Sequence, residues 1–173
     1  MADTLLTTLE KSAEGERRER LICFVCTGNT CRSPMAEAVF NHLAGSSGVG
    51  GFERLVSAEC LRATSAGLCA HGEPISKNAS LALEEAGIPS REDNDYKSHV
   101  SRPIDQEIMK NAELVVGISS AHAIGLVMKY PQYASKITCM PSDIPDPYGG
   151  SVEVYRECLD KIRQGVEEIY KNL

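Results

Sequence analysis

The sequence lacks any run of apolar residues long enough to span a membrane, because a transmembrane helix needs about 20 of them in succession. Its first 20 residues, MADTLLTTLEKSAEGERRER, also lack the basic start and the apolar stretch that a secretory signal combines. Both absences predict a cytoplasmic protein that has no membrane partner.

Positive charge is scarce as well. The chain has 18 Lys and Arg against 24 Asp and Glu, which gives a formal net charge of -6. A nucleic-acid partner would require a clustered basic face, so the composition excludes the nucleic-acid-binding classes.

Cysteine and histidine are present without the patterns of a disulfide framework or a metal site. The seven cysteines are odd in number and scattered along the chain, which is typical of a reduced protein. The four histidines lack the spacing of metal ligands, so we expect surface or capping roles for them and neither a metal nor another cofactor. These histidines are His42, His71, His99 and His122.

The length and composition favour one α/β domain. The chain has 173 residues, of which 42% are hydrophobic, and this is enough apolar surface for a single core. Residues 1–20 are charged and show only a weak helical pattern, so we interpret them as a flexible or helical N-terminal extension. Residues 21–173 are then one domain.

The domain begins with a strand, a tight loop and a helix. Residues 21–25, LICFV, form a continuous apolar run that predicts a strand buried on both faces, as in a parallel sheet. Ser33 and Pro34 predict the N-cap and the first position of a helix, which runs to the glycine-rich residues 45–51.

The rest of the chain repeats this alternation, without internal repeats or low-complexity segments. Strands are expected at 60–67, 113–119 and 136–140, and helices at 76–87, 104–112, 121–131 and 151–173. Such an order predicts a doubly wound, four-stranded parallel sheet with helices on both faces. Ligands of this architecture bind beyond the carboxyl ends of the strands.

A motif that could carry out a reaction lies at the carboxyl end of the first predicted strand. In VCTGNTCRSP, residues 25–34, the amides of residues 27–32 can curl around an anion, and Arg32 adds a guanidinium that suits two phosphate oxygens. Gly28 and Asn29 are the residue types that most readily take the positive φ such a loop needs. The motif therefore predicts an oxyanion site.

The same surroundings would activate the thiol of Cys26. Free cysteine has a pKa of about 8.5, whereas helix N-termini and cations lower it to roughly 3.5–7.5. Cys26 is therefore predicted to be a thiolate nucleophile in a site for dianions, which points to phosphoryl transfer to sulfur. Cys23 lies inside the strand and is expected to be a core residue.

Such a reaction also needs an acid for the leaving group and a base for water. Residues 143–150, DIPDPYGG, form a turn-rich segment after the last predicted strand, on the same sheet edge. Asp146, between two prolines, is the preferred candidate, and Asp143 is the reserve.

Together, C-x5-R-S-P at Cys26–Pro34 and DPYGG at 146–150 resemble the low-molecular-weight protein tyrosine phosphatases, from about Leu21 to the end of the chain. The resemblance implies a metal-free, two-step phosphatase. Cys26 would attack phosphorus, Arg32 would hold the transition state, and Asp146 would protonate the leaving group and then deprotonate water. Around the phosphate, the resemblance also assigns binding positions to Thr27, Gly28, Asn29, Thr30, Cys31, Ser33 and Tyr148.

The resemblance also assigns supporting residues to the loop. Ser33 would hydrogen-bond the Cys26 thiolate, Asn29 would hold the left-handed turn, and Ser65 would brace it. Residues 45–60 and 91–96 look longer than in compact bacterial members, and we interpret them as surface insertions.

The substrate is predicted from Thr30 and Tyr148. The string CTGNTCRSPMAE is similar to the bacterial protein arginine phosphatases, and the Thr30 hydroxyl could hydrogen-bond a guanidinium where an aliphatic residue could only pack. Tyr148 is followed by glycine, whereas eukaryotic tyrosine phosphatases often have two adjacent aromatics. Phosphoarginine in proteins is favoured, phosphotyrosine stays open, and inorganic phosphate would be the product.

Three alternatives use the same loop. Arsenate reductases of this fold need a further cysteine pair, and residues 70–138 contain no cysteine. A phosphocarrier would not need Arg32 and Asp146 to activate water, and an anion sensor would bind phosphate without turnover. A reversible disulfide between Cys26 and Cys31 also stays open.

Overall fold

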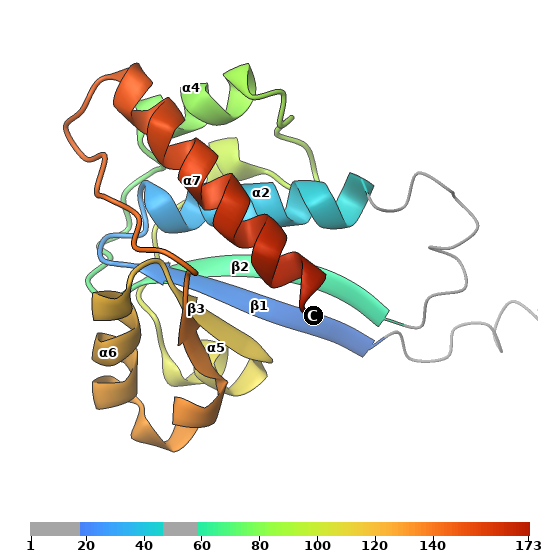
Figure 1. The fold of residues 1–173 in the computed structure, drawn as a ribbon, viewed down its shortest axis with the longest axis vertical. Coiled ribbons are helices and arrows are strands. Elements are labelled where there is room, and N and C mark those ends of the chain that lie inside the picture. Colours follow the sequence, from blue (N-terminus) through green and yellow to red (C-terminus); the bar gives the residue numbers. More distant parts are fainter. Residues whose placement is uncertain (1–17, 47–58) are drawn as a thin grey trace, which may run out of the picture.

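The computed structural model describes residues 18–46 and 59–173 of the chain. Its centre is one parallel sheet of four strands in the order β2-β1-β3-β4 (Figure 1). The strands are β1 (Arg18–Cys26), β2 (Glu59–Gly67), β3 (Leu114–Gly117) and β4 (Ile137–Cys139). The four-stranded parallel sheet predicted from the alternating pattern is therefore confirmed.

The register of the sheet aligns the carboxyl ends of its strands. Cys26 lies opposite Gly67, Val25 lies opposite Gly117, and Gly117 lies opposite Cys139. The loops that follow the four strands therefore start from one edge, where doubly wound folds bind their ligands.

Helices cover both faces of the sheet (Figure 1). One face carries α2 (Arg32–Ser46), α4 (Lys77–Glu85) and α7 (Val152–Lys171), and the other carries α5 (Gln106–Asn111) and α6 (Ser120–Lys129). Short 3-10 helices lie at Tyr96–Ser98, between α4 and α5, and at Pro131–Lys136, after α6.

The alternation of side chains along β1 explains the two layers. Ile22 and Phe24 pack into the cluster that α2, α4 and α7 share, whereas Cys23 and Val25 pack with residues of α5 and α6 on the other face. All four of these side chains are fully buried, as expected of a strand covered on both faces. Burial raises the pKa of Cys23 to about 12, so this thiol is a core group, as predicted.

Several predicted boundaries shift. β1 begins at Arg18 rather than Leu21, because residues 18–20 pair with residues 59–61 of β2; residues 1–17 of the predicted extension lie outside the described residues. α2 begins at Arg32, so Ser33 lies inside its first turn and is not an N-cap. Its hydroxyl instead contacts the Cys26 thiol.

Residues 91–96 lie mostly at the surface, as predicted, because four of the six are exposed, but two residues anchor the segment. Asn94 and Tyr96 are buried, and they donate hydrogen bonds to the carbonyls of Ala38 and Ile88, respectively. The segment thus packs against α2. Of the other predicted insertion, residues 47–58 lie outside the described residues.

In residues 18–46 and 59–173, no helix combines the length and the apolar character that crossing a bilayer requires.

Candidate active site

Cys26 is the last residue of β1, and Arg32 is the first residue of α2. The five residues between them form a loop. Residues 26–32, which include both ends, are called the cysteine loop here. The Cys26 sulfur lies 3.0 Å from Ser33 Oγ and accepts a hydrogen bond from the Asn29 amide at 3.3 Å. The loop therefore surrounds a buried thiol with donors.

Asn29 holds the shape of the loop. It alone among the described non-glycine residues has a positive φ, 57°, and its side-chain nitrogen donates to Ser33 Oγ and Ser65 Oγ, both at 2.9 Å. Its Oδ1 accepts from the Arg102 amide at 2.9 Å. The expected left-handed turn is confirmed at Asn29, but Gly28 has no positive φ, so the expectation for it was wrong. One residue in the left-handed region, Asn29, is therefore enough to close this loop.

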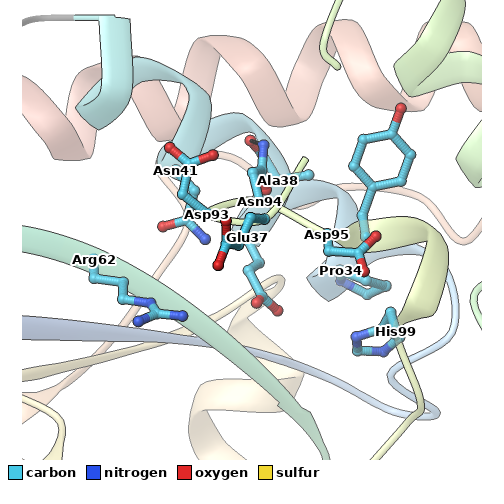
Figure 2. Close-up of a pocket in the computed structure, with 11 residues that line it drawn as sticks. Pro34, Glu37, Ala38, Asn41, Arg62, Asp93, Asn94, Asp95 and His99 are labelled. Carbon is cyan, nitrogen blue, oxygen red and sulfur yellow. Dashed lines mark hydrogen bonds between the residues drawn. The ribbon is translucent and has the colours of Figure 1, made fainter. Parts of the chain in front are cut away.

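Behind the loop, Ser65 links the hydrogen-bond network of Asn29 to the half-buried carboxylate of Glu37. Ser65 Oγ donates to Glu37 Oε2 at 2.6 Å, and Glu37 faces a polar cavity of about 240 Å³. Figure 2 shows the Glu37 side chain between Arg62 and His99 among the residues that line this cavity. Burial raises the pKa of Glu37, while the Ser65 hydrogen bond and His99 oppose the rise.

The end of β2 presses on the cysteine loop. A Cβ atom added at Gly67 would lie 2.7 Å from the Thr27 carbonyl oxygen, closer than side chains tolerate. The amides of Leu68 and Cys69 donate to the carbonyls of Cys26 and Thr27, both at 2.9 Å. Glycine at this position therefore lets β2 buttress the loop directly.

Arg32 is buried beside the loop and only partly paired. Its Nη2 forms an ion pair with Asp146 Oδ2 at 2.7 Å, and its Nη1 donates to the Ile144 carbonyl at 3.4 Å. Its Nε is buried and has no hydrogen-bond partner among the described residues. A buried guanidinium donor without a partner favours an anionic ligand at this position.

The structure separates the two candidate acids of residues 143–150, called the aspartate loop here. Asp146 is half exposed, pairs with Arg32 and accepts from the Tyr148 amide at 3.2 Å. Asp143 instead accepts from the amide of Ser120 at 2.8 Å and from its hydroxyl at 3.1 Å, at the start of α6. Asp146 is thus joined to the cysteine loop, and Asp143 is a helix cap. The Tyr148 side chain is 78% exposed at the rim.

Thr30 and Cys31 have different surroundings. Thr30 is half-buried, and its Oγ1 lies 3.6 Å from Cys31 Sγ. Cys31 is buried, and its sulfur lies 3.2 Å from the Tyr155 hydroxyl. Burial and then Cys31 raise the pKa of Tyr155 to about 12. The proposed disulfide between Cys26 and Cys31 stays a prediction.

Two histidines contact the loop, although no sequence pattern indicates these contacts. His99 Nε2 donates to the Asn29 carbonyl at 2.8 Å, and His122 Nε2 lies 3.0 Å from Thr27 Oγ1. His99 is the C-cap residue of Tyr96–Ser98, in line with the capping role expected of it, but its ring also contacts the loop. His122 is buried, so a surface role is wrong for it. Neither lies near the cysteine loop in the sequence, so only the strand order brings them there.

No group of three or more His, Cys, Asp or Glu side chains placed to hold a metal ion occurs in residues 18–46 and 59–173. The donors that the site does contain are amides, hydroxyls and one guanidinium. This set suits an anion rather than a metal cation.

Comparisons with known proteins agree with this geometry. The model of a family described as low molecular weight phosphotyrosine protein phosphatase matches residues 21–173. A protein-arginine-phosphatase of Bacillus subtilis is 32% identical over 159 residues, covering 88% of this chain and 95% of that protein. An arsenate reductase of Staphylococcus aureus is 29% identical over 149 residues, covering 86% and 95%.

Among solved structures, a low molecular weight protein tyrosine phosphatase from T. tengcongensis is similar to the chain with a TM-score of 0.76 and 34% identity. The similarity covers 89% of this chain and 99% of that one. The likeness therefore extends over the whole fold described above.

Proposed function

The chain belongs to the low molecular weight phosphotyrosine protein phosphatase family, and we propose that it is a cysteine-dependent protein phosphatase that prefers phosphoarginine and also accepts phosphotyrosine. One observation carries the chemistry. The buried Cys26 sulfur accepts from the Asn29 amide and contacts Ser33 Oγ, in a loop that ends at the incompletely paired guanidinium of Arg32. A nucleophile and an anion-binding group thus share one pocket.

In the first step, Cys26 attacks the substrate phosphorus. The S–P bond forms as the bond from phosphorus to the leaving nitrogen, or to a phenolic oxygen, breaks. Charge on the transferred phosphoryl oxygens would be stabilised by the amides of the cysteine loop and by Arg32. Ser33 accepts from Asn29, and its hydroxyl lies 3.0 Å from the sulfur and 3.3 Å from the Ala66 carbonyl, so its proton would move from the carbonyl to the sulfur as charge develops there.

Asp146 supplies the proton for the leaving group. In the free enzyme one of its oxygens is occupied by Arg32 at 2.7 Å. A phosphoryl group suits the guanidinium fork in the same way, so substrate binding would draw Arg32 away and release this oxygen. The released carboxylate takes up a proton from solvent and then donates it to the departing nitrogen or oxygen. In the second step it takes a proton from the water that breaks the S–P bond and yields inorganic phosphate.

The preference for phosphoarginine rests on Thr30 and on the rim. Among the residues that the structure describes, the Thr30 hydroxyl has one long contact, 3.6 Å to the Cys31 sulfur, and so remains able to accept from a substrate guanidinium. The exposed Tyr148 is followed by Gly149, so no second aromatic side chain stands next to it to hold a phenyl ring. The similar protein from B. subtilis is a protein-arginine-phosphatase.

The experiment compares kcat/KM for phosphoarginine and phosphotyrosine peptides in the wild type, Thr30→Val and Thr30→Ile. Valine keeps the volume and removes only the hydroxyl, whereas isoleucine also adds bulk. We expect Thr30→Val to lose about tenfold on phosphoarginine relative to phosphotyrosine, the effect of one lost hydrogen bond to a charged group. An unchanged ratio would reject the arginine preference and leave the phosphatase assignment standing.

The alternatives are separated by turnover of p-nitrophenyl phosphate without metal. A phosphatase turns over, a phosphocarrier is labelled once, and an anion sensor only binds. An arsenate reductase would require a relay of thiols, but residues 70–138 contain no cysteine. We further propose that the partners are phosphorylated proteins, that no cofactor takes part, and that the enzyme acts in the cytoplasm, where thiols stay reduced.

A further inference from the structure

His122 is buried in the first turn of α6 and is not used in the chemistry above. Its Nε2 lies 3.0 Å from Thr27 Oγ1, and its Nδ1 lies 2.7 Å from Ser119 Oγ. Thr27 is the residue directly after the nucleophile. The imidazole ring therefore joins the start of α6 to the cysteine loop.

Both ring nitrogens have a hydroxyl partner, which suits a neutral ring. Neutral imidazole offers one donor and one acceptor, and a hydroxyl can fill either role, so both tautomers are satisfied. Burial lowers the pKa of His122 and Arg32 adds to this, while Asp146 and Asp143 oppose it. These three charged groups come from α2 and from the aspartate loop.

The start of α6 is also tied to the aspartate loop and to the sheet. Asp143 accepts from the Ser120 amide and hydroxyl. A Cβ atom added at Gly117, the last residue of β3, would lie only 2.6 Å from the Ala123 amide nitrogen. The start of α6 therefore lies directly against the end of β3. From there, His122 contacts the loop that carries Cys26, and Ser120 contacts the loop that carries Asp146.

We propose that His122 is a positioning residue, which acts through Thr27 and fixes the nucleophile loop relative to the loop of the acid. This inference rests on the proposed function. His122 touches neither the phosphoryl group nor the sulfur in this role. Its loss should therefore lower kcat, which depends on the alignment of Cys26 with Asp146, more than it weakens phosphate binding.

The test is a double-mutant cycle with His122→Phe and Thr27→Val, assayed with p-nitrophenyl phosphate. Phenylalanine keeps a ring of similar size, and valine keeps the shape of threonine. We expect each single variant to lose about 3- to 10-fold in kcat, from the net value of one hydrogen bond. The double variant should be no slower than the slower single variant, because both changes break the same contact.

Three further measurements separate positioning from a merely structural effect. The inhibition constant of inorganic phosphate should change less than twofold in His122→Phe. His122→Gln, whose amide can reach Thr27, should recover part of kcat. The acid side of the wild-type kcat profile should contain an ionisation that both His122 variants lack.

The proposal is overturned if the losses multiply in the double variant, if His122→Phe keeps the wild-type kcat, or if phosphate inhibition weakens in proportion to kcat. Thermal melting identifies a variant that fails to fold, and His122→Gln then decides by its kcat and pH profile. A wild-type protein without turnover would instead reject the proposed function itself. The two failures are therefore distinguishable.

Discussion

Two aspartates only three positions apart have different structural roles. Asp146 pairs with the buried Arg32, whereas Asp143 accepts from both donors of Ser120 at the start of α6. The sequence already favours Asp146, which lies between two prolines, but both aspartates lie in the same turn-rich segment and their partners cannot be read from it. Their partners support the proposal that Asp146 carries the proton chemistry, whereas Asp143 holds the start of α6.

At this scale we predict that Asp146→Asn lowers kcat by about 10²- to 10⁴-fold, the usual contribution of a general acid. Its melting temperature should stay near that of the wild type, because Asp146 is half exposed. Asp143→Asn is the matched control, and it should lower the melting temperature more than Asp146→Asn does, since the amide nitrogen cannot accept from the Ser120 hydroxyl as Oδ2 does. Kinetics with p-nitrophenyl phosphate and thermal melting check both. A larger kcat loss in Asp143→Asn would contradict the assignment.

At the scale of elements, the contact between β2 and the cysteine loop depends on the absence of one side chain. A Cβ atom at Gly67 would meet the Thr27 carbonyl at 2.7 Å and the Ala70 Cβ at 3.0 Å. Backbone cannot move aside as a flexible side chain can. The end of β2 and the loop after β1 are therefore in direct backbone contact, so a shift of β2 would shift the loop as well.

We predict that Gly67→Ala destabilises the protein by about 1–3 kcal/mol, the range for overpacking in a core, and that it lowers kcat. Gly165→Ala in α7 is the control. Its Cβ would meet the flexible end of Met140 at 3.3 Å and Pro141 Cδ at an ordinary contact distance of 3.4 Å, and alanine favours the helix. Denaturant unfolding of both variants measures the difference. Equal stability of the two would show that the close approach of β2 is not rigid.

At the scale of the whole molecule, buried titratable groups make stability depend on pH. The pKa of His122 is lowered from 6.5, chiefly by burial, so below pH 6.5 the unfolded chain binds more protons than the folded one. The stability that His122 contributes is therefore complete above pH 6.5 and is lost as the pH falls. Glu37 has the opposite sign, because its pKa is raised from 4.5 by burial.

We predict that the free energy of unfolding of the wild type rises with pH below 6.5, and that His122→Phe rises less steeply over the same range. His42, whose pKa burial also lowers, contributes in the same direction to both proteins and cancels in the comparison. Urea unfolding at several pH values gives the two slopes. Parallel slopes would mean that His122 does not titrate differently in the folded state.

Sequence by itself determined the parts of this protein that are local. The apolar run of β1 and the alternation of strands and helices predicted the sheet, and the spacing of Cys26, Asn29 and Arg32 predicted the loop, because these depend on neighbours along the chain. Only the tertiary structure decided the roles of His99 and His122, the separation of Asp143 from Asp146, and the burial of Asn94. These depend on the strand order β2-β1-β3-β4, which brings distant loops to one edge and which no local pattern encodes.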